Sequence, residues 1–187
     1  MKFRTLTLGA IAALLFACNT TTPLPETTTP VVSVERGENL VTTLGCNDCH
    51  SPKMMTPMGP AIDSGRMLSG HSAEEMLPPY DKQTASGYVL FSMGGTAMVG
   101  PWGTSFAANI SADSTGIGGW TEAQFMKAMK EGKWKGLDNT RPLLPPMPWQ
   151  GYSKLSDDEL MSIFAYLKSV PAVKNVVPAP LPPQLAD

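Results

Sequence analysis

Apolar residues recur at helical spacing in three segments of the chain, and a residue that commonly caps helices precedes each segment. In the last segment, Ser156 and Glu159 form a capping box. Leu155 and Leu160 flank this box at the positions of a hydrophobic staple. Signals for strands are scarce elsewhere, so the pattern predicts an all-α fold. The three predicted helices cover residues 33–44, 121–132 and 156–170.

The region 51–108 has little periodic pattern and holds seven methionines. Ser72 and Glu75 form a further capping-box pattern, which predicts a short helix there. His71 precedes it and is expected to be a surface or hydrogen-bonded histidine. A stretch of this length indicates a functional, loop-rich insertion. Its methionines most simply pack against a cofactor, and a copper(I) site is the alternative. The methionines considered for copper are Met54, Met55, Met58 and Met67.

The N-terminus has the layout of an export signal. Lys2 and Arg4 precede an apolar run over residues 6–17, which is too short to span a bilayer. The run leads to Cys18 in a pattern that resembles a bacterial lipobox. We therefore expect residues 1–17 to be a lipoprotein signal peptide and Cys18 to carry the lipid; an ordinary signal beside a chance cysteine is the alternative. Because no Asp follows Cys18, the lipoprotein pattern implies the outer membrane, with the domain in the periplasm.

Composition divides the rest of the chain. Residues 18–32 are rich in Thr and Pro, cannot bury enough apolar surface to fold, and are expected to form a tether. Residues 178–187 form a second, Pro-rich extended tail. The length of 187 residues suits a single domain, expected over residues 33–177. The formal net charge of -2 argues against nucleic acid as a partner.

The most informative motif is C-x-x-C-H, formed by Cys46, Cys49 and His50. Cysteines at positions i and i+3 lie on one face of a helical turn, so both sulfurs can reach the two vinyl groups of one porphyrin. The histidine that follows is then placed to bind the iron. The motif predicts one covalently attached haem c, held by Cys46 and Cys49, with His50 as an axial ligand.

Other uses of the paired cysteines fit less well. A thiol oxidoreductase would need a strand before the motif, where the pattern is helical. A zinc site needs four nitrogen or sulfur ligands, and the chain offers only His71 beyond the motif and Cys18. The segment 109–115, which includes Asp113, holds some oxygen ligands for Ca²⁺ but lacks an EF-hand pattern. We therefore assign no metal to this segment, and the sequence leaves open whether any additional metal ion is bound.

Met147 is the predicted second axial ligand. Pro145, Pro146 and Pro148 surround it, and because each proline fixes φ, the loop presents the sulfur from a stiff backbone. Stiffness matters because a thioether is a weak ligand. A core methionine in a proline-rich loop is the simpler alternative, and His71 is a rival ligand.

The run GENLVTTLGCNDCH, residues 37–50, resembles the opening of a class I cytochrome c domain. The resemblance implies the class I cytochrome c fold, in which the first helix crosses the last at a small residue, here Gly37. It also implies a distal methionine between the haem motif and the last helix. Trp120 and Arg141 resemble groups that contact a haem propionate, and Tyr166 resembles the aromatic residue that packs on the first helix.

The predicted ligand set determines the predicted function. With His50 and Met147 both bound, the iron has no free position for a substrate. The sequence therefore predicts a non-enzymatic carrier of single electrons between redox proteins such as dehydrogenases, oxidases or other cytochromes. The alternative is a haem enzyme or gas-sensing domain in which the methionine leaves the iron. A basic group near the second predicted helix is a candidate docking surface, formed by Lys127, Lys130, Lys133 and Lys135.

Overall fold

The structure of the protein, a computed structural model, describes residues 31–183. The predicted signal peptide, the predicted lipid-bearing Cys18 and nearly all of the predicted tether lie outside the described residues, as does the end of the predicted C-terminal tail. Within residues 31–183, no helix is both long enough and apolar enough to span a bilayer.

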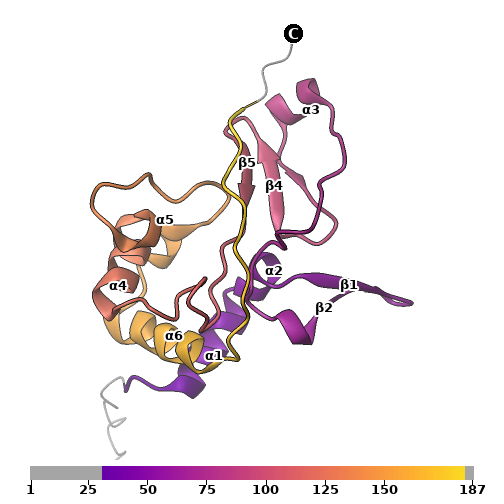
Figure 1. Cartoon of the computed structure of the whole chain (residues 1–187). Helices are drawn as coiled ribbons and strands as arrows, with labels where there is room; N and C mark the ends of the chain where they lie inside the picture. The colour runs from indigo at the N-terminus through magenta and orange to yellow at the C-terminus, as the bar shows by residue number, and fades with distance from the viewer. Residues whose placement is uncertain (1–30, 184–187) are drawn as a thin grey trace, which may run out of the picture.

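Three longer helices form one end of the molecule (Figure 1). They are α1 (Val34–Thr43), α4 (Glu122–Glu131) and α6 (Asp157–Ser169). The Ser33 hydroxyl accepts a hydrogen bond from the Arg36 N–H and so caps α1. Thr121 and Ser156 each complete a capping box at the start of α4 and α6. These three helix predictions are confirmed.

Helices α1 and α6 cross directly against each other, and Gly37 lies at the crossing. A Cβ atom on Gly37 would stand 1.9 Å from the carbonyl oxygen of Ser162 and 2.7 Å from the Cβ of Tyr166. The expected small residue at the crossing and the packing of Tyr166 on the first helix are therefore confirmed. The core lies around this crossing. Its buried apolar side chains are Val41, Leu68, Ile117, Phe125, Leu160, Ile163, Phe164, Leu167 and Val170.

The all-α prediction is wrong, because two small antiparallel sheets form within residues 51–108 (Figure 1). The first is a projecting hairpin of β1 (Lys53–Thr56) and β2 (Gly59–Ile62). The second, in the order β3-β4-β5, consists of β3 (Leu90–Phe91), β4 (Ala97–Gly100) and β5 (Gly103–Phe106). Each strand has two to four residues, which is too short for an alternating pattern to stand out in the sequence.

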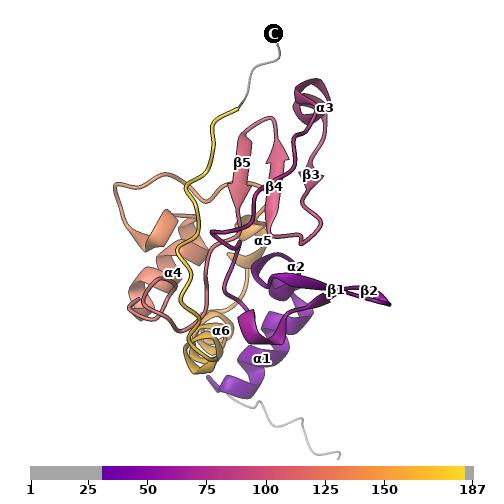
Figure 2. The same cartoon turned by 45° about the vertical axis from the view of Figure 1, so that its right-hand side comes forward.

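The C-terminal segment runs back along the molecule to the second sheet (Figure 2). There Leu181 and Thr104 exchange two backbone hydrogen bonds, of 3.0 and 2.9 Å. The approach depends on Gly103, which has a φ of 99° and whose Cβ, if present, would stand 2.2 Å from the Leu181 carbonyl oxygen. Contacts with the domain therefore continue past residue 177.

The short helix predicted at Ser72 is also wrong. The chain makes only a turn there, closed by a 3.2 Å hydrogen bond from the Glu75 N–H to the Ser72 carbonyl oxygen. A pair of prolines follows a few residues later and prevents a helix from continuing. A short helix forms further on instead, α3 (Lys82–Gly87), where the Asp81 carboxylate accepts from the Thr84 N–H at 2.6 Å.

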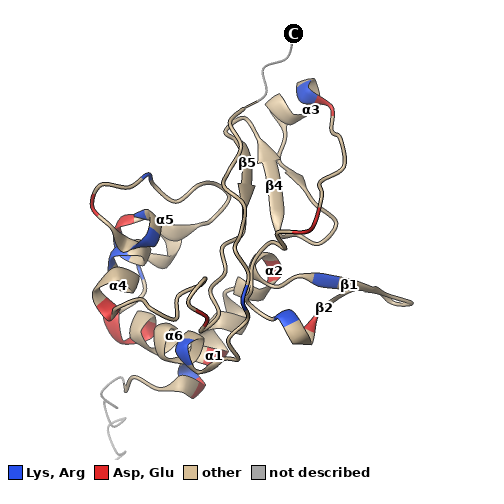
Figure 3. Ribbon diagram, viewed as in Figure 1, with Lys and Arg blue, Asp and Glu red and all other residues tan. Residues whose placement is uncertain are grey.

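The remaining helical elements are short and connect the larger ones. Their bounds are α2 (Cys46–His50), α5 (Trp149–Tyr152) and two 3-10 turns, Ser64–Arg66 and Trp134–Gly136. Charged residues concentrate on the helices and the loops between them, whereas β4 and β5 carry none (Figure 3). The uncharged sheet lies above α2, the helix that holds the C-x-x-C-H motif, in the view of Figure 2.

Candidate functional site

The C-x-x-C-H motif forms helix α2, which follows α1 after a sharp turn at Gly45. The Gly45 N–H bonds the Thr42 carbonyl oxygen at 3.2 Å and ends α1, while its own carbonyl accepts from the Asp48 N–H at 3.0 Å and begins α2. Gly45 has a left-handed φ of 70°, and a Cβ there would stand 2.8 Å from the Asp48 carboxylate. Glycine is therefore required for the turn that presents the motif.

Cys46 and Cys49 carry free thiols, and neither side chain is fully buried. Burial raises the pKa of the Cys46 thiol to about 11 and raises that of Cys49 as well. Both sulfurs are therefore protonated at neutral pH, whereas a thiol oxidoreductase depends on a thiolate with a lowered pKa. This disfavours disulfide exchange and leaves two sulfurs, one helical turn apart, free to form thioethers.

The imidazole of His50 is held by a backbone carbonyl from the far end of the 51–108 region. Its Nδ1 lies 2.8 Å from the carbonyl oxygen of Ala108. A carbonyl oxygen only accepts, so Nδ1 carries the proton and Nε2 keeps a free lone pair. Burial also lowers the pKa of His50, which favours the neutral ring. This is the form in which a histidine binds a metal ion.

A second segment of the 51–108 region, around Leu68 and Gly70, holds the C-terminal end of α2 by hydrogen bonds. The Gly70 N–H donates to the His50 carbonyl oxygen at 2.7 Å, and the Leu68 N–H donates to the Ser51 hydroxyl at 2.9 Å. Leu68 has a left-handed φ of 59°, which is uncommon for a residue other than glycine. Its fully buried side chain and a 2.8 Å bond from the Ile110 N–H to its carbonyl hold it there. Residues 51–108 therefore set the orientation of His50.

Lys53, on β1, caps the end of the motif helix. Its ammonium donates to three backbone carbonyl oxygens at the end of α2, those of Asn47, Asp48 and Ser51. The Asn47 carbonyl also accepts from the Ser51 N–H at 3.3 Å, and a cation is favourable beside carbonyl oxygens at the C-terminal end of a helix. Partial burial lowers the pKa of Lys53. The structure thus holds a positive charge next to Cys49 and His50.

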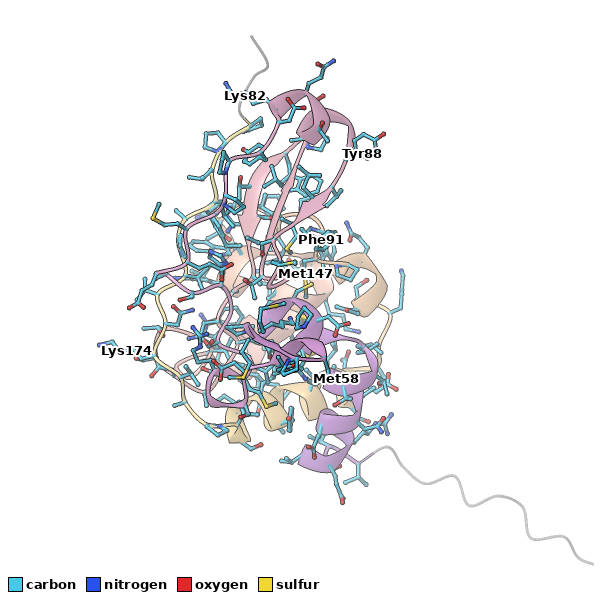
Figure 4. The ribbon with its side chains drawn as sticks, turned by 90° about the vertical axis from the view of Figure 1, so that its right-hand side faces the viewer. Met58, Lys82, Tyr88, Phe91, Met147 and Lys174 are labelled. Atoms are coloured by element: carbon cyan, nitrogen blue, oxygen red, sulfur yellow. The ribbon has the colours of Figure 1, made fainter. Side chains whose placement is uncertain are left out.

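Met147 is half-buried on the loop between α4 and α6. A pocket of about 200 Å³ lies beside it, lined by Leu143 and residues 145–150. In the view of Figure 4, Met147 lies between α2 and the three-stranded sheet. The helix that follows the loop is tied to the residue before Gly45, because the Tyr152 hydroxyl donates to the Leu44 carbonyl oxygen at 2.9 Å. The structure therefore joins the helix after the Met147 loop to the turn that precedes the motif.

Trp120 and Arg141, the residues predicted to contact a haem propionate, have other contacts in the structure. Trp120 is half-buried and packs against the hydrophobic core. The guanidinium of Arg141 lies over the ring of Trp134, 4.9 Å from its centroid, and donates to the Pro142 carbonyl oxygen at 3.0 Å. None of these contacts joins either residue to α2, so their roles at a propionate stay predictions.

His71 is a buried, hydrogen-bonded histidine with 1% of its surface exposed. Its Nδ1 lies 2.9 Å from the Thr96 hydroxyl, and its ring stacks on Phe106 with the centroids 4.7 Å apart. Its Nε2 has no hydrogen-bond partner within residues 31–183. Of the surface and hydrogen-bonded histidines that the sequence allowed, the structure shows the hydrogen-bonded one.

The alternative metal sites gain no support. Met54 and Met55 are adjacent on β1, so their side chains leave the hairpin on opposite faces, and Met58 is 96% exposed at its turn. In the 109–115 segment, Asp113 accepts hydrogen bonds from the N–H and hydroxyl of Thr115 at 2.8 and 2.6 Å. No group of three or more His, Cys, Asp or Glu side chains in the described part of the chain is arranged to hold a metal ion.

The lysines near α4 are partly neutralised. Lys127 forms an ion pair with Asp138, and Lys130 forms one with Asp157 at 3.0 Å. Two members of the basic group therefore have acidic partners on the same surface, which weakens the expected docking surface.

The residues present fit a covalently bound haem. The motif supplies two free thiols and an unprotonated imidazole nitrogen, and the Met147 loop supplies a thioether. Sequence reasoning found these groups but missed Ala108 and Lys53. Ala108 acts through its backbone carbonyl, which every residue type has, and Lys53 resembles any surface lysine until β1 places it at the helix end.

Comparison with known proteins points in the same direction. The chain is 34% identical over 97 residues to the fructose dehydrogenase cytochrome subunit of Gluconobacter japonicus. It is 38% identical over 74 residues to the gluconate 2-dehydrogenase cytochrome c subunit of Pantoea cypripedii. It is also 38% identical over 87 residues to a subunit of the nicotinate dehydrogenase of Pseudomonas putida. These likenesses support a cytochrome c domain.

The matches are partial in both directions. They cover 48%, 39% and 46% of this chain, but 19%, 16% and 7% of the three relatives in the order given. The chain therefore corresponds to a small part of each longer relative. No family model matches it.

Proposed function

We propose that this protein is a monohaem cytochrome c that carries single electrons and performs no substrate chemistry of its own. The observation that carries the proposal is the Nδ1 hydrogen bond of His50 to Ala108, which leaves Nε2 free beside two unpaired thiols. When bound, the haem supplies an iron that takes up and gives up one electron.

Each residue of the site has a distinct task in this proposal. Cys46 and Cys49 would hold the porphyrin through thioether bonds, and His50 would bind the iron through Nε2. The carbonyl of Ala108 fixes the plane of the imidazole and its tautomer. Met147, on its proline-rich loop, would supply the second ligand to the iron and so leave no place for a substrate.

The proposed redox partner is a dehydrogenase. The support is the likeness to cytochrome subunits of dehydrogenases. A cytochrome domain would receive electrons from such an enzyme and pass them on. Stopped-flow mixing of the oxidised protein with a substrate-reduced dehydrogenase from the same cell should show rapid appearance of the ferrous spectrum. Slow reduction at every enzyme concentration would contradict this partner.

Covalent attachment is tested by haem staining of denaturing gels after acid-acetone extraction. The wild type should keep its stain, and the double variant Cys46→Ala, Cys49→Ala should lose it. The matched control is Cys18→Ser, which removes the third cysteine and should keep the stain. Haem that extracts from the wild type would contradict the proposal.

Axial ligation is tested by the weak long-wavelength band of a ferric haem bound by a thioether. Met147→Leu should abolish the band and lower the midpoint potential, because a thioether favours the ferrous state. The matched control is Met58→Leu, since Met58 is 96% exposed. If the ferrous wild type binds carbon monoxide readily, a gas-sensing or enzymatic haem domain is the better description.

We also propose that the protein is exported and anchored by a lipid on Cys18 after removal of residues 1–17. The support comes from the sequence alone: basic residues, then an apolar run, then Cys18. The outer membrane, with the domain in the periplasm, is the proposed location. Anchoring would keep the domain close to partners at one membrane face.

A further inference from the structure

The middle of the Met147 loop is attached to the three-stranded sheet by one side chain. The hydroxyl of Ser105, on β5, donates to the carbonyl oxygen of Pro145 at 2.6 Å. Ser105 is buried, with 5% of its surface exposed. The residues it joins are 40 positions apart in the sequence. The bond therefore connects the 51–108 region to the loop that carries the predicted second axial ligand.

The Ser105 hydroxyl is directed by a second contact. The indole N–H of Trp102 donates to the Ser105 oxygen at 3.2 Å. A hydroxyl has one proton to donate, and the Met98 carbonyl oxygen, at 3.4 Å, is a much longer alternative acceptor than Pro145. The Ser105 hydroxyl thus accepts from Trp102 and donates to Pro145. The two bonds form a chain from the β4–β5 turn to the loop.

Among residues 31–183, the other hydrogen bonds that join this loop to the rest of the protein lie at its two ends. At the first end, the Leu143 N–H bonds the Gly132 carbonyl oxygen at 2.7 Å. At the other end, Tyr152 of α5 bonds the Leu44 carbonyl oxygen. Between these points, the Ser105 bond is the one hydrogen bond within the described residues that joins the loop to the sheet.

We propose that Ser105 is a positioning residue for Met147, so that the β4–β5 hairpin sets how firmly the thioether stays on the iron. The proposal rests on the proposed function, in which Met147 is the axial ligand. Loss of the Ser105 hydroxyl frees the Pro145 carbonyl and lets the loop populate positions in which the sulfur is withdrawn. An added ligand then competes more easily, because it binds only when the sulfur has left.

The experiment measures the affinity of the ferric holoprotein for imidazole. Loss of the long-wavelength thioether band reports the binding. Ser105→Ala should raise this affinity about three- to tenfold, the factor by which one ordinary hydrogen bond changes an equilibrium constant. Trp102→Phe keeps an aromatic side chain, with a smaller ring, and removes the N–H; it should raise the affinity by a smaller factor. This variant also serves if Ser105→Ala fails to fold.

The matched control is Ser92→Ala. The Ser92 hydroxyl, next to β3, accepts from the Ala97 N–H at 3.2 Å, and within residues 31–183 it makes no hydrogen bond to the loop. Its imidazole affinity should equal that of the wild type. An equal rise in Ser92→Ala would show general loosening of the sheet and overturn the proposal.

Met147→Leu distinguishes an error in the positioning role of Ser105 from an error in the ligand assignment of Met147. If this variant abolishes the band while Ser105→Ala and Trp102→Phe bind imidazole as the wild type does, the positioning role is wrong and the ligand assignment stands. If Met147→Leu keeps the band, the ligand assignment is wrong and the positioning role falls with it.

Discussion

Gly37 of α1 lies so close to Ser162 of α6 that a methyl group on the glycine would stand 1.9 Å from the serine carbonyl oxygen. The two helix backbones are therefore in direct contact. The Ser33 N–H adds a 3.2 Å hydrogen bond to the Ser162 hydroxyl at the start of α1. Because only Leu44 and Gly45 separate α1 from α2, this crossing also fixes where the C-x-x-C-H motif stands.

Gly37→Ala should destabilise the holoprotein by about 1–3 kcal/mol, the usual range for adding a group to a fully packed contact. The free energy of unfolding in urea measures the effect. Gly119→Ala is the matched control, because a Cβ on Gly119 has no atom within 4 Å. Equal stability of the Gly37→Ala variant and the wild type would contradict the close crossing.

Lys53→Met should lower the midpoint potential of the bound haem. Removing a cation beside the motif disfavours the ferrous state, which carries one positive charge less than the ferric state. The three carbonyl bonds at the end of α2 are lost as well, so stability should fall by about 1–2 kcal/mol. Lys154→Met makes the same charge change at an exposed position and should leave both quantities nearly unchanged.

The stability of the wild type should fall as the pH decreases below about 6.5, the ordinary pKa of histidine, because of His71. Burial lowers the pKa of His71 despite Glu75, whose carboxylate lies 3.9 Å from Nδ1. In this pH window the unfolded chain binds a proton that the folded protein does not, so protonation favours unfolding. The dependence ends below the lowered pKa of the folded state.

His71→Asn provides the comparison for this pH dependence. Its amide can still bond Thr96 but does not titrate. The difference in unfolding free energy between the variant and the wild type, measured from pH 8 to pH 5, should move in favour of the variant as the pH falls. Parallel curves would show that His71 titrates alike in the folded and unfolded chains.

Cys18→Ser should release the protein from membranes or leave its signal peptide in place. The reason is that a serine has no thiol to carry the lipid, and the anchor would be lost. Fractionation of the native host followed by haem staining measures the distribution. A wild type found wholly in the soluble fraction would contradict the lipid anchor.

Features encoded by a few neighbouring residues could be predicted from the sequence. The capping patterns at Ser33, Thr121 and Ser156 located three helices, because caps satisfy backbone groups within one turn. The cysteine and histidine spacing of α2 is equally local. The pattern at Ser72 failed, because no apolar stripe follows it and prolines interrupt the chain.

The sheets could not be predicted, because strands of two to four residues are held by partners distant in sequence rather than by their own pattern. Thr104, for example, bonds Leu181.

The sequence by itself therefore determined which chemical groups the proposed site offers: two thiols, an imidazole and a thioether between prolines. The tertiary structure alone decided how these groups are held. The carbonyl of Ala108 fixes the tautomer of His50 from 58 positions away, and the hydroxyl of Ser105 reaches Pro145 across 40. Such partners are backbone groups or common polar side chains, and nothing in their residue types marks them until folding brings them within hydrogen-bonding distance.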